Sequence, residues 1–315
     1  MLDIIIPHYD EPWEVGKPYF DMLACQRGVD FDSFKVLLIH DGVKAFPQDW
    51  FACYPYKVEQ HRIVHGGVSE ARNFGLALSD AEWVTFSDFD DTFTNIYALR
   101  GIMSCMDKDV DYMWTPFFVE CMRDGELGVK IREENLVWVH GKYFRRKFLN
   151  DNNIRFPVGI HYSEDSAFCA LVNEIVSDDR RGKIKLEYPA YSWVFRKDSV
   201  STDPANRAKN MTGFIDRNTY VVEEFKRRGI DHIPMVGRMF ADAYWAFHQV
   251  KYRFDDEEKR FALISKKYVD DLKQNKKDVF EKILKSAKES FKGYEIDMSE
   301  SFGKWLKRLE EMRNV

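Results

Sequence analysis

Three carboxylates stand together at residues 88–91, where the apolar stretch Trp-Val-Thr-Phe runs into Ser-Asp-Phe-Asp-Asp. A strand alternates its side chains, so Asp88 and Asp90 would point to the same side. Two carboxylates at close range repel each other, whereas Mg²⁺ and Mn²⁺ are often held by one or two carboxylates plus substrate phosphates. The spacing therefore predicts a divalent metal site at Asp88 and Asp90. The plain alternative is a solvated acidic turn in which Asp91 and Thr92 cap a following helix.

The first hundred residues predict strands that alternate with helices. Apolar runs at 2–6, 35–39, 58–64 and 84–86 indicate strands, and residues 17–25 and 68–78 have helical spacing. This alternation is typical of an α/β fold, in which helices cover both faces of a mostly parallel sheet.

Polar residues follow three of these strands, at 7–10, 40–42 and 88–91. The carboxyl ends of parallel strands meet at one edge of a sheet, and ligands of such sheets bind beyond that edge. Loop histidines and Asp-Gly turns are individually common. Their shared placement predicts a ligand site.

Four segments then carry a resemblance: IIIPHYD at 4–10, IHDG at 39–42, GGVSEARNFGL at 66–76 and FSDFDD at 86–91. In order and spacing they resemble the motifs of inverting glycosyltransferases of the GT-A fold, of the glycosyltransferase family 2 type. That family uses nucleotide-diphosphate sugars. The resemblance implies a Rossmann-like nucleotide-binding domain with a mostly parallel sheet flanked by helices.

The resemblance also implies roles for residues of the first half. Those expected at the donor are Pro7, Tyr9 and Asp41 around the base and ribose, Arg72 near the nucleotide, Asp88 near the ribose or metal, and Asp90 on Mn²⁺ or Mg²⁺. Asp41 can accept from a base N–H, so UDP is the expected nucleotide. His40 stands where the family commonly has Asp, which leaves the base open. Without the resemblance, the alternative for Arg72 is an ion pair with Glu70 or Asp80 on a helix surface.

A second pair of carboxylates, Glu164 and Asp165, opens a predicted helix after a strand at 111–118 and an apolar and basic segment at 138–150. The plain interpretation is helix capping. The resemblance continues through this region and implies that Asp165 is the general base, with Glu164 orienting the acceptor. Trp138 and His140 are candidates for the acceptor pocket, and a structural histidine with satisfied hydrogen bonds is an equal alternative for His140.

A last strand at 190–195 leads into Arg196, Lys197 and a loop that continues to Ser201. The family often closes a mobile loop over the diphosphate here, and cations offset pyrophosphate charge. The alternative is an ordinary basic surface loop. The resemblance ends near residue 202.

Beyond it the pattern becomes helical, and we expect a GT-A catalytic domain at 1–205 and a helical extension at 206–315. The catalytic domain would comprise a nucleotide-sugar half, 1–95, and an acceptor half, 96–205. The helices expected in the extension are 211–228, 236–253, 257–272, 278–291 and 299–312. They could shape the acceptor site, form a homo-oligomer or dock a partner.

The composition and net charge indicate which classes of binding partner and which cell compartment to expect. The net charge of −5 disfavours nucleic acid, although the basic run Arg145, Arg146 and Lys147 keeps a nucleic-acid acceptor open. No apolar run reaches the length of a membrane span, no leader is evident, and the five cysteines form no CxxC pair, which predicts a cytoplasmic protein.

The expected activity is metal-dependent, inverting transfer of a sugar from a nucleotide diphosphate to the hydroxyl of a glycan or another acceptor. Two alternatives remain: a catalytically weak sugar-nucleotide or glycan-binding module, and a nucleotidyltransferase. The latter usually requires a basic, glycine-rich loop, and residues 4–10 contain neither glycine nor lysine.

Overall fold

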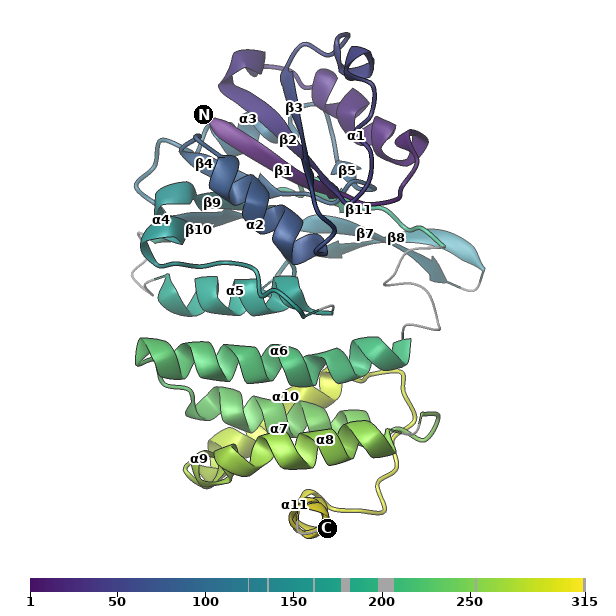
Figure 1. The fold of residues 1–315 in the computed structure, drawn as a ribbon, viewed down its shortest axis with the longest axis vertical. Helices are drawn as coiled ribbons and strands as arrows, with labels where there is room; N and C mark the ends of the chain where they lie inside the picture. Colours follow the sequence, from purple (N-terminus) through teal and green to yellow (C-terminus); the bar gives the residue numbers. More distant parts are fainter. Residues whose placement is uncertain are drawn as a thin grey trace. The chain divides into compact units, whose positions relative to one another are not determined.

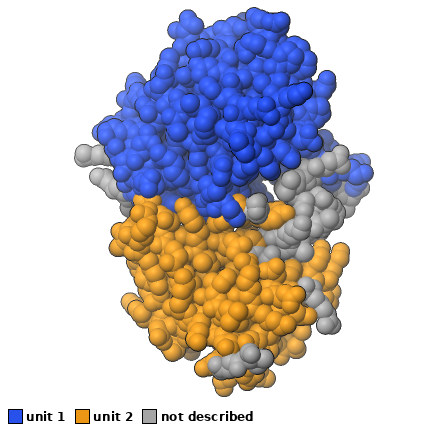
Figure 2. All heavy atoms as spheres, viewed as in Figure 1, with its two compact units in different colours: residues 1–159, 164–199 blue, residues 160–163, 200–315 orange. Residues whose placement is uncertain are grey.

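The computed structural model describes residues 1–123, 125–134, 136–160, 162–176, 182–197, 207–252 and 254–313. The chain divides into two compact units, residues 1–159 with 164–199 and residues 160–163 with 200–315 (Figures 1 and 2). Each unit has its own apolar core. The predicted boundary at residue 205 falls outside the described residues and stays a prediction.

The larger sheet of the first unit has seven strands in the order β10-β6-β9-β4-β1-β2-β3. Their bounds are β1 Leu2–His8, β2 Phe34–Asp41, β3 Lys57–Ile63, β4 Trp83–Phe86, β6 Tyr112–Trp114, β9 Lys142–Arg145 and β10 Lys183–Lys185. Neighbouring strands are parallel except where β9 runs antiparallel between β4 and β6. Leu2, Ile4, Ile5 and Ile6 are fully buried, as a mostly apolar central strand predicts. Asp3 between them is also buried, and its Oδ2 accepts from the backbone N–H of Ala81.

Helices pack on this sheet: α1 Trp13–Ala24, α2 Val68–Leu78, α3 Ala98–Met103, α4 Arg146–Asp151 and α5 Glu164–Ile175 (Figure 1). Helix α2 approaches β1 closely because Gly75 has no side chain. A Cβ atom at this position would lie 2.4 Å from Cγ2 of Ile5. The close approach packs the last turns of α2 against Ile5 of β1 and Ile39 of β2.

A smaller sheet has the order β5-β11-β7-β8, with β5 Thr92–Phe93, β11 Tyr191–Trp193, β7 Phe117–Arg123 and β8 Glu126–Arg132. The single strand predicted at 111–118 is wrong, because β6 and β7 lie in different sheets. The break falls at Thr115 and Pro116, and proline cannot donate to a sheet ladder. Thr92 begins a strand, so the alternative in which Asp91 and Thr92 cap a helix is also wrong.

The second unit is helical, which confirms the predicted C-terminal helical region. Its helices are α6 Arg207–Arg228, α7 Ile233–Phe247, α8 Asp255–Ser265, α9 Val269–Lys273, α10 Lys277–Ser290 and α11 Phe302–Met312. Aromatic residues of α7, α8 and α11, including Phe240, Phe261 and Trp305, pack in its core. No helix in the described part of the chain is long and apolar enough to span a membrane.

Candidate functional site

One guanidinium joins the two predicted carboxylate groups. Arg72 on α2 donates from Nη2 to Oδ1 of Asp88 at 2.7 Å and from Nη1 to Oε1 of Glu164 at 2.8 Å. Its side chain is buried, and its guanidinium lies 5.1 Å from the ring centre of Phe156. The surface pairing with Glu70 or Asp80 is therefore wrong for Arg72. Asp88 and Glu164, 76 residues apart in sequence, lie on two sides of one buried cation.

The neighbouring Asn73 fixes the loop that leads to Glu164. Its Nδ2 donates to the carbonyl of Phe156 at 2.8 Å, and its Oδ1 accepts from the backbone N–H of Phe156 at 2.9 Å. Two successive residues of α2 thus hold Phe156 and the first turn of α5.

Asp165 lies beside this ion pair at the start of α5, where the helix dipole favours negative charge. Burial and then the charge of Glu164 raise the pKa of Asp165 to about 7, although Arg72 and the backbone N–H of Ser166 act against the rise. A carboxylate with a pKa near neutrality is a suitable proton acceptor at physiological pH.

The two acidic residues predicted for a metal differ in environment. Burial alone would raise the pKa of Asp88, but the positive charge of Arg72 and the proximity of His140 outweigh it, and the pKa is lowered. Burial and the charge of Asp88 raise the pKa of Asp90 to about 6. Arg196, the cation predicted for the diphosphate, has its Nε 3.5 Å from Oδ2 of Asp90. The rest of that predicted loop, residues 198–201, lies outside the described residues.

Asp91 has a different role from the predicted cap. Its buried carboxylate accepts from the Tyr191 hydroxyl at 2.6 Å and from the backbone N–H of Val194 at 3.0 Å. The Tyr191 oxygen in turn accepts from the backbone N–H of Asp88 at 3.1 Å. Asp91 therefore ties the carboxylate loop to β11. This contact was not predicted from the sequence, where the only hint of it is a third acidic residue in the DFDD run at 88–91.

A possible ligand set for a cation lies in the same place. Asp88, Asp91 and His140 each offer one atom, and these atoms lie within 4.8 Å of one another. Burial lowers the pKa of His140 to about 4, so its imidazole is neutral and able to bind metal. Carboxylate oxygens with one imidazole suit Mn²⁺, and the carboxylates alone suit Mg²⁺. The donor set thus fits a divalent ion, and it shares Asp88 with the predicted pair but contains Asp91 and His140 in place of Asp90.

At the ends of β1 and β2, Asp41 fastens the turn that begins α2. Its two oxygens accept from the backbone N–H of Gly66 at 2.7 Å, from that of Gly67 at 2.9 Å and from Nδ1 of His65 at 3.0 Å. Gly67 has a φ of +92°, a conformation that side chains disfavour. The predicted contact of Asp41 with a base stays a prediction.

Beside that turn, the exposed ring of Tyr9 stacks on His65, with ring centres 4.7 Å apart and planes inclined by 28°. Pro7 belongs to β1 and pairs with Ile39 of β2. A planar base could stack on the exposed Tyr9 ring.

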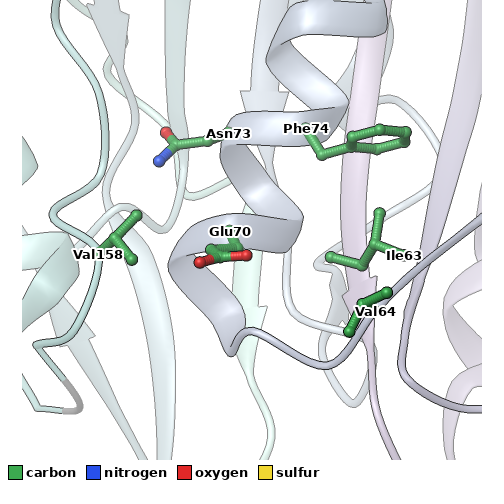
Figure 3. A pocket seen from close by; sticks show the side chains of 6 residues that line it. All are labelled: Ile63, Val64, Glu70, Asn73, Phe74 and Val158. Atoms are coloured by element: carbon green, nitrogen blue, oxygen red, sulfur yellow. The ribbon is translucent and has the colours of Figure 1, made fainter.

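A cavity of about 380 Å³ lies along α2 and is lined by Glu70, Asn73 and Phe74 of this helix together with Ile63, Val64 and Val158. Figure 3 shows Glu70 on α2 between Val158 on one side and Ile63 and Val64 on the other, with Phe74 above them. None of the predicted site residues lines this cavity. It is therefore distinct from the carboxylate cluster.

The fold and the placement of these carboxylates define a GT-A α/β protein, as predicted. A sequence profile of glycosyl transferase family 2 matches residues 3–162, more than half of the chain. The chain therefore belongs to this family, which confirms both the resemblance and the expected enzyme class. Membership in this family speaks against the nucleotidyltransferase alternative.

Two curated relatives from Bacillus subtilis (strain 168) match part of the chain. The minor teichoic acid biosynthesis protein GgaB is 23% identical over 193 residues, which cover 55% of this chain and 21% of GgaB. The uncharacterized glycosyltransferase EpsJ is 22% identical over 192 residues, which cover 53% of this chain and 54% of EpsJ. The matched region thus spans about a fifth of GgaB and about half of EpsJ.

Solved structures share the fold. S. aureus TarS has a TM-score of 0.63 at 17% identity, with 98% of this chain and 55% of that chain covered. TarS 1–349 in complex with UDP-GlcNAc has a TM-score of 0.54 at 16% identity, covering 95% and 98%. The Pyrobaculum calidifontis mannosyltransferase PcManGT, in complex with GDP-Man and Mn²⁺, has a TM-score of 0.50 at 12% identity, covering 99% and 84%. Identities this low establish the fold alone.

Proposed function

We propose that this chain transfers a sugar, with inversion, from a nucleotide diphosphate to an acceptor hydroxyl. The family assignment supports sugar transfer, and the structurally similar TarS 1–349 was solved with UDP-GlcNAc, which supports UDP as the nucleotide. Pro7, Tyr9 and Asp41 would surround the base and ribose, and Arg196 would contact the diphosphate.

One observation supports the catalytic assignment above all others: the Arg72 bridge between Asp88 and Glu164. It brings the donor carboxylates of the nucleotide half near Asp165 in the acceptor half. Asp165 has a pKa of about 7, which suits a general base, whereas a solvated capping carboxylate would keep an ordinary pKa.

In the proposed reaction, the acceptor oxygen attacks the anomeric carbon on the face opposite the diphosphate. The new C–O bond forms as the bond to the diphosphate breaks, and the leaving group keeps the electron pair. Asp165 takes the hydroxyl proton. Glu164, held by Arg72, would orient the acceptor, and Trp138 would lie in the acceptor pocket.

Asp88 and Asp90 would hold Mn²⁺ or Mg²⁺, and Asp91 and His140 lie close enough to Asp88 to contribute. The raised pKa of Asp90 supports this role, because a carboxylate that ionises reluctantly beside another gains most from a bound cation. A bound divalent ion would neutralise charge on the departing diphosphate. Arg196 already lies beside Asp90 and would act on the same charge.

The chemical class of the acceptor can be tested by screening candidate acceptors. GgaB is named for minor teichoic acid biosynthesis, so we propose hydroxyls of cell-surface polysaccharides as the first acceptors to screen. The division into a catalytic domain at 1–205 and a helical extension at 206–315 remains part of the proposal.

Thermal denaturation with a panel of nucleotide sugars in Mn²⁺ tests the donor, because a ligand that binds only the folded state raises its melting temperature. We expect a UDP-sugar to raise it and donor hydrolysis to stop in EDTA. Equal melting temperatures with all donors, together with no hydrolysis in Mn²⁺, would leave a glycan-binding module as the better description.

A further inference from the structure

The free edges of the two sheets differ in how they are protected. Among the described strands, the edges are β3 and β10 in the larger sheet and β5 and β8 in the smaller one. An unpaired edge is a template for another chain unless it is short or charged. Strand β10 has three residues, β5 has two, and β3 carries an ion pair between Lys57 and Glu59. Strand β8 has seven residues and an apolar face.

That apolar face is exposed to solvent. Leu127, Val129 and Ile131 alternate along β8 and are 59%, 59% and 50% exposed. Met122, opposite Leu127 on β7, is 47% exposed. The buried Phe117 lies opposite Arg132, so the core lies on the other face of this hairpin. Exposed apolar patches rimmed by charge commonly mark interaction surfaces.

The sequence of β8 is complementary to itself when two copies run antiparallel. With Val129 opposite Val129, Leu127 lies opposite Ile131, and Glu126 lies opposite Arg132. Each pair occurs twice, and paired residues point to the same face of the joined sheet. Across the two β8 strands, one face would therefore carry an apolar band, flanked on β7 by Glu120 opposite Val129. The other face would carry two ion pairs.

We propose that β8 pairs with β8 of a second copy of this chain about a two-fold axis at Val129. The two neighbouring registers are less favourable. A two-fold axis at Lys130 places Lys130 opposite Lys130, and an axis at Gly128 leaves Ile131 and Arg132 beyond the end of the partner strand. The guanidinium of Arg132 lies 5.2 Å from the ring centre of Trp138. The contact with Trp138 uses the flat face of the Arg132 guanidinium. A carboxylate of the second copy would bind the N–H groups at the edge of that guanidinium, so Arg132 can make both contacts. The proposal is independent of the sugar-transfer assignment.

Sedimentation velocity across a concentration series tests this dimer. We expect a dimer for the full chain that dissociates on dilution, because a single strand pair is a small interface. V129K places two lysines on the axis and should raise the dissociation constant by about tenfold or more. L263K is the matched control, since Leu263 of α8 is 64% exposed. L263K should remain dimeric, whereas a monomeric L263K with a dimeric V129K would place the interface in the helical unit.

The ion pairs allow a second, more specific test. E126R should weaken the dimer about tenfold, and the double variant E126R/R132E should recover most of the loss. Circular dichroism and melting curves check that each variant is folded. Failure of the double variant to recover would overturn the register.

Cross-linking tests the axis directly. Residues directly opposite in an antiparallel pair have Cα atoms about 4.5–5.5 Å apart, within the range of a disulfide. In a background with Cys25→Ser and Cys53→Ser, both exposed in the native chain, V129C should form a covalent dimer on oxidation and K130C should not. A monomeric wild type at every concentration, or equal cross-linking of both variants, would overturn the proposal.

Discussion

Nη2 of Arg72 lies 2.7 Å from Oδ1 of Asp88, and the guanidinium is almost wholly buried. Because Arg72 also contacts Glu164, it connects the carboxylates after β4 to those at the start of α5. A buried arginine keeps its charge at every accessible pH and offers a rigid fork of donors. This connection orients both groups at once.

Replacing Arg72 by lysine should test that geometry. Lysine keeps the charge but cannot reach both carboxylates with a planar fork, so we expect turnover to fall by about 100-fold. R72M should also lower the free energy of unfolding by about 3 kcal/mol, because it leaves two partly buried carboxylates without their cation. Steady-state kinetics and urea unfolding measure the two effects.

The matched control for R72K is R62K, because Arg62 is exposed on β3. We expect R62K to have wild-type turnover and stability. Equal turnover in R72K and the wild type would show that the bridge is not needed to orient the carboxylates.

The pKa of about 7 at Asp165 predicts a specific pH profile. A general base acts only when it is deprotonated, so kcat/KM should rise about tenfold per pH unit below pH 7 and level off above it. The profile should be measured with saturating metal. A profile that stays flat from pH 5 to about 8 would contradict a base with this pKa.

Asp165 should also lower stability at high pH. Its pKa is about 7 in the folded protein, above the ordinary 3.8, so the folded state binds the proton more tightly. Stability from this group should therefore fall as the pH rises from 3.8 to about 7 and stay constant above that. At pH 8, D165N should be more stable than the wild type, whereas D151N, at an exposed site of α4, should not.

Metal binding should depend on Asp90. D90A should abolish both transfer and donor hydrolysis, and EDTA should do the same in the wild type. Since the pKa of Asp90 is about 6, protons compete with the metal below that value, and Mn²⁺ affinity should rise as the pH increases through 6. Electron paramagnetic resonance of free Mn²⁺ gives the affinity. Unchanged hydrolysis by D90A in chelated buffer would argue against a metal.

The helical unit contains its own pH-dependent network. Arg308 of α11 donates to both oxygens of Glu258 and of Glu300, and hydrogen bonds from Arg308 are the largest cause of the lowered pKa of Glu300. The stability due to Glu300 is present above its ordinary pKa of 4.5 and should be lost as the pH falls through the lowered value.

We therefore expect R308A to lower the free energy of unfolding by about 2 kcal/mol at pH 7 and to reduce the acid dependence. K304A, on the same helix, is the control. Thermal melts at several pH values measure both variants, and identical acid dependence in R308A and the wild type would contradict the network's role.

Local patterns predicted the elements that lie in the central sheet. The mostly apolar runs of β1, β2 and β4 and the helical spacing of α2 depend on neighbours close in sequence. The hairpin of β7 and β8 was not predicted, because β8 turns its apolar residues to solvent and its charged residues toward the other face. The change of sheet between Trp114 and Phe117 depends on pairing with β11, far along the chain.

Sequence patterns likewise predicted some residues of the candidate site and missed the contacts between them. An acidic run after a strand predicted Asp88 and Asp90, because that placement is visible in a short window. The role of Asp165 came from the family resemblance, since Glu164 and Asp165 by themselves indicate only a helix cap. The partners of Arg72 and the contact of Asp91 with Tyr191 join residues 16 to 100 positions apart. No local sequence pattern predicts such distant pairs. Glu70 and Asp80, which are close to Arg72 in sequence, were therefore equally plausible partners for it.

The most direct measurement compares D165N with the wild type for donor binding and sugar transfer in Mn²⁺. Asn keeps the shape of the side chain but cannot take a proton. We expect donor affinity within about twofold of the wild type and transfer reduced by at least about 1,000-fold. Transfer at the wild-type rate in D165N would contradict Asp165 as the general base.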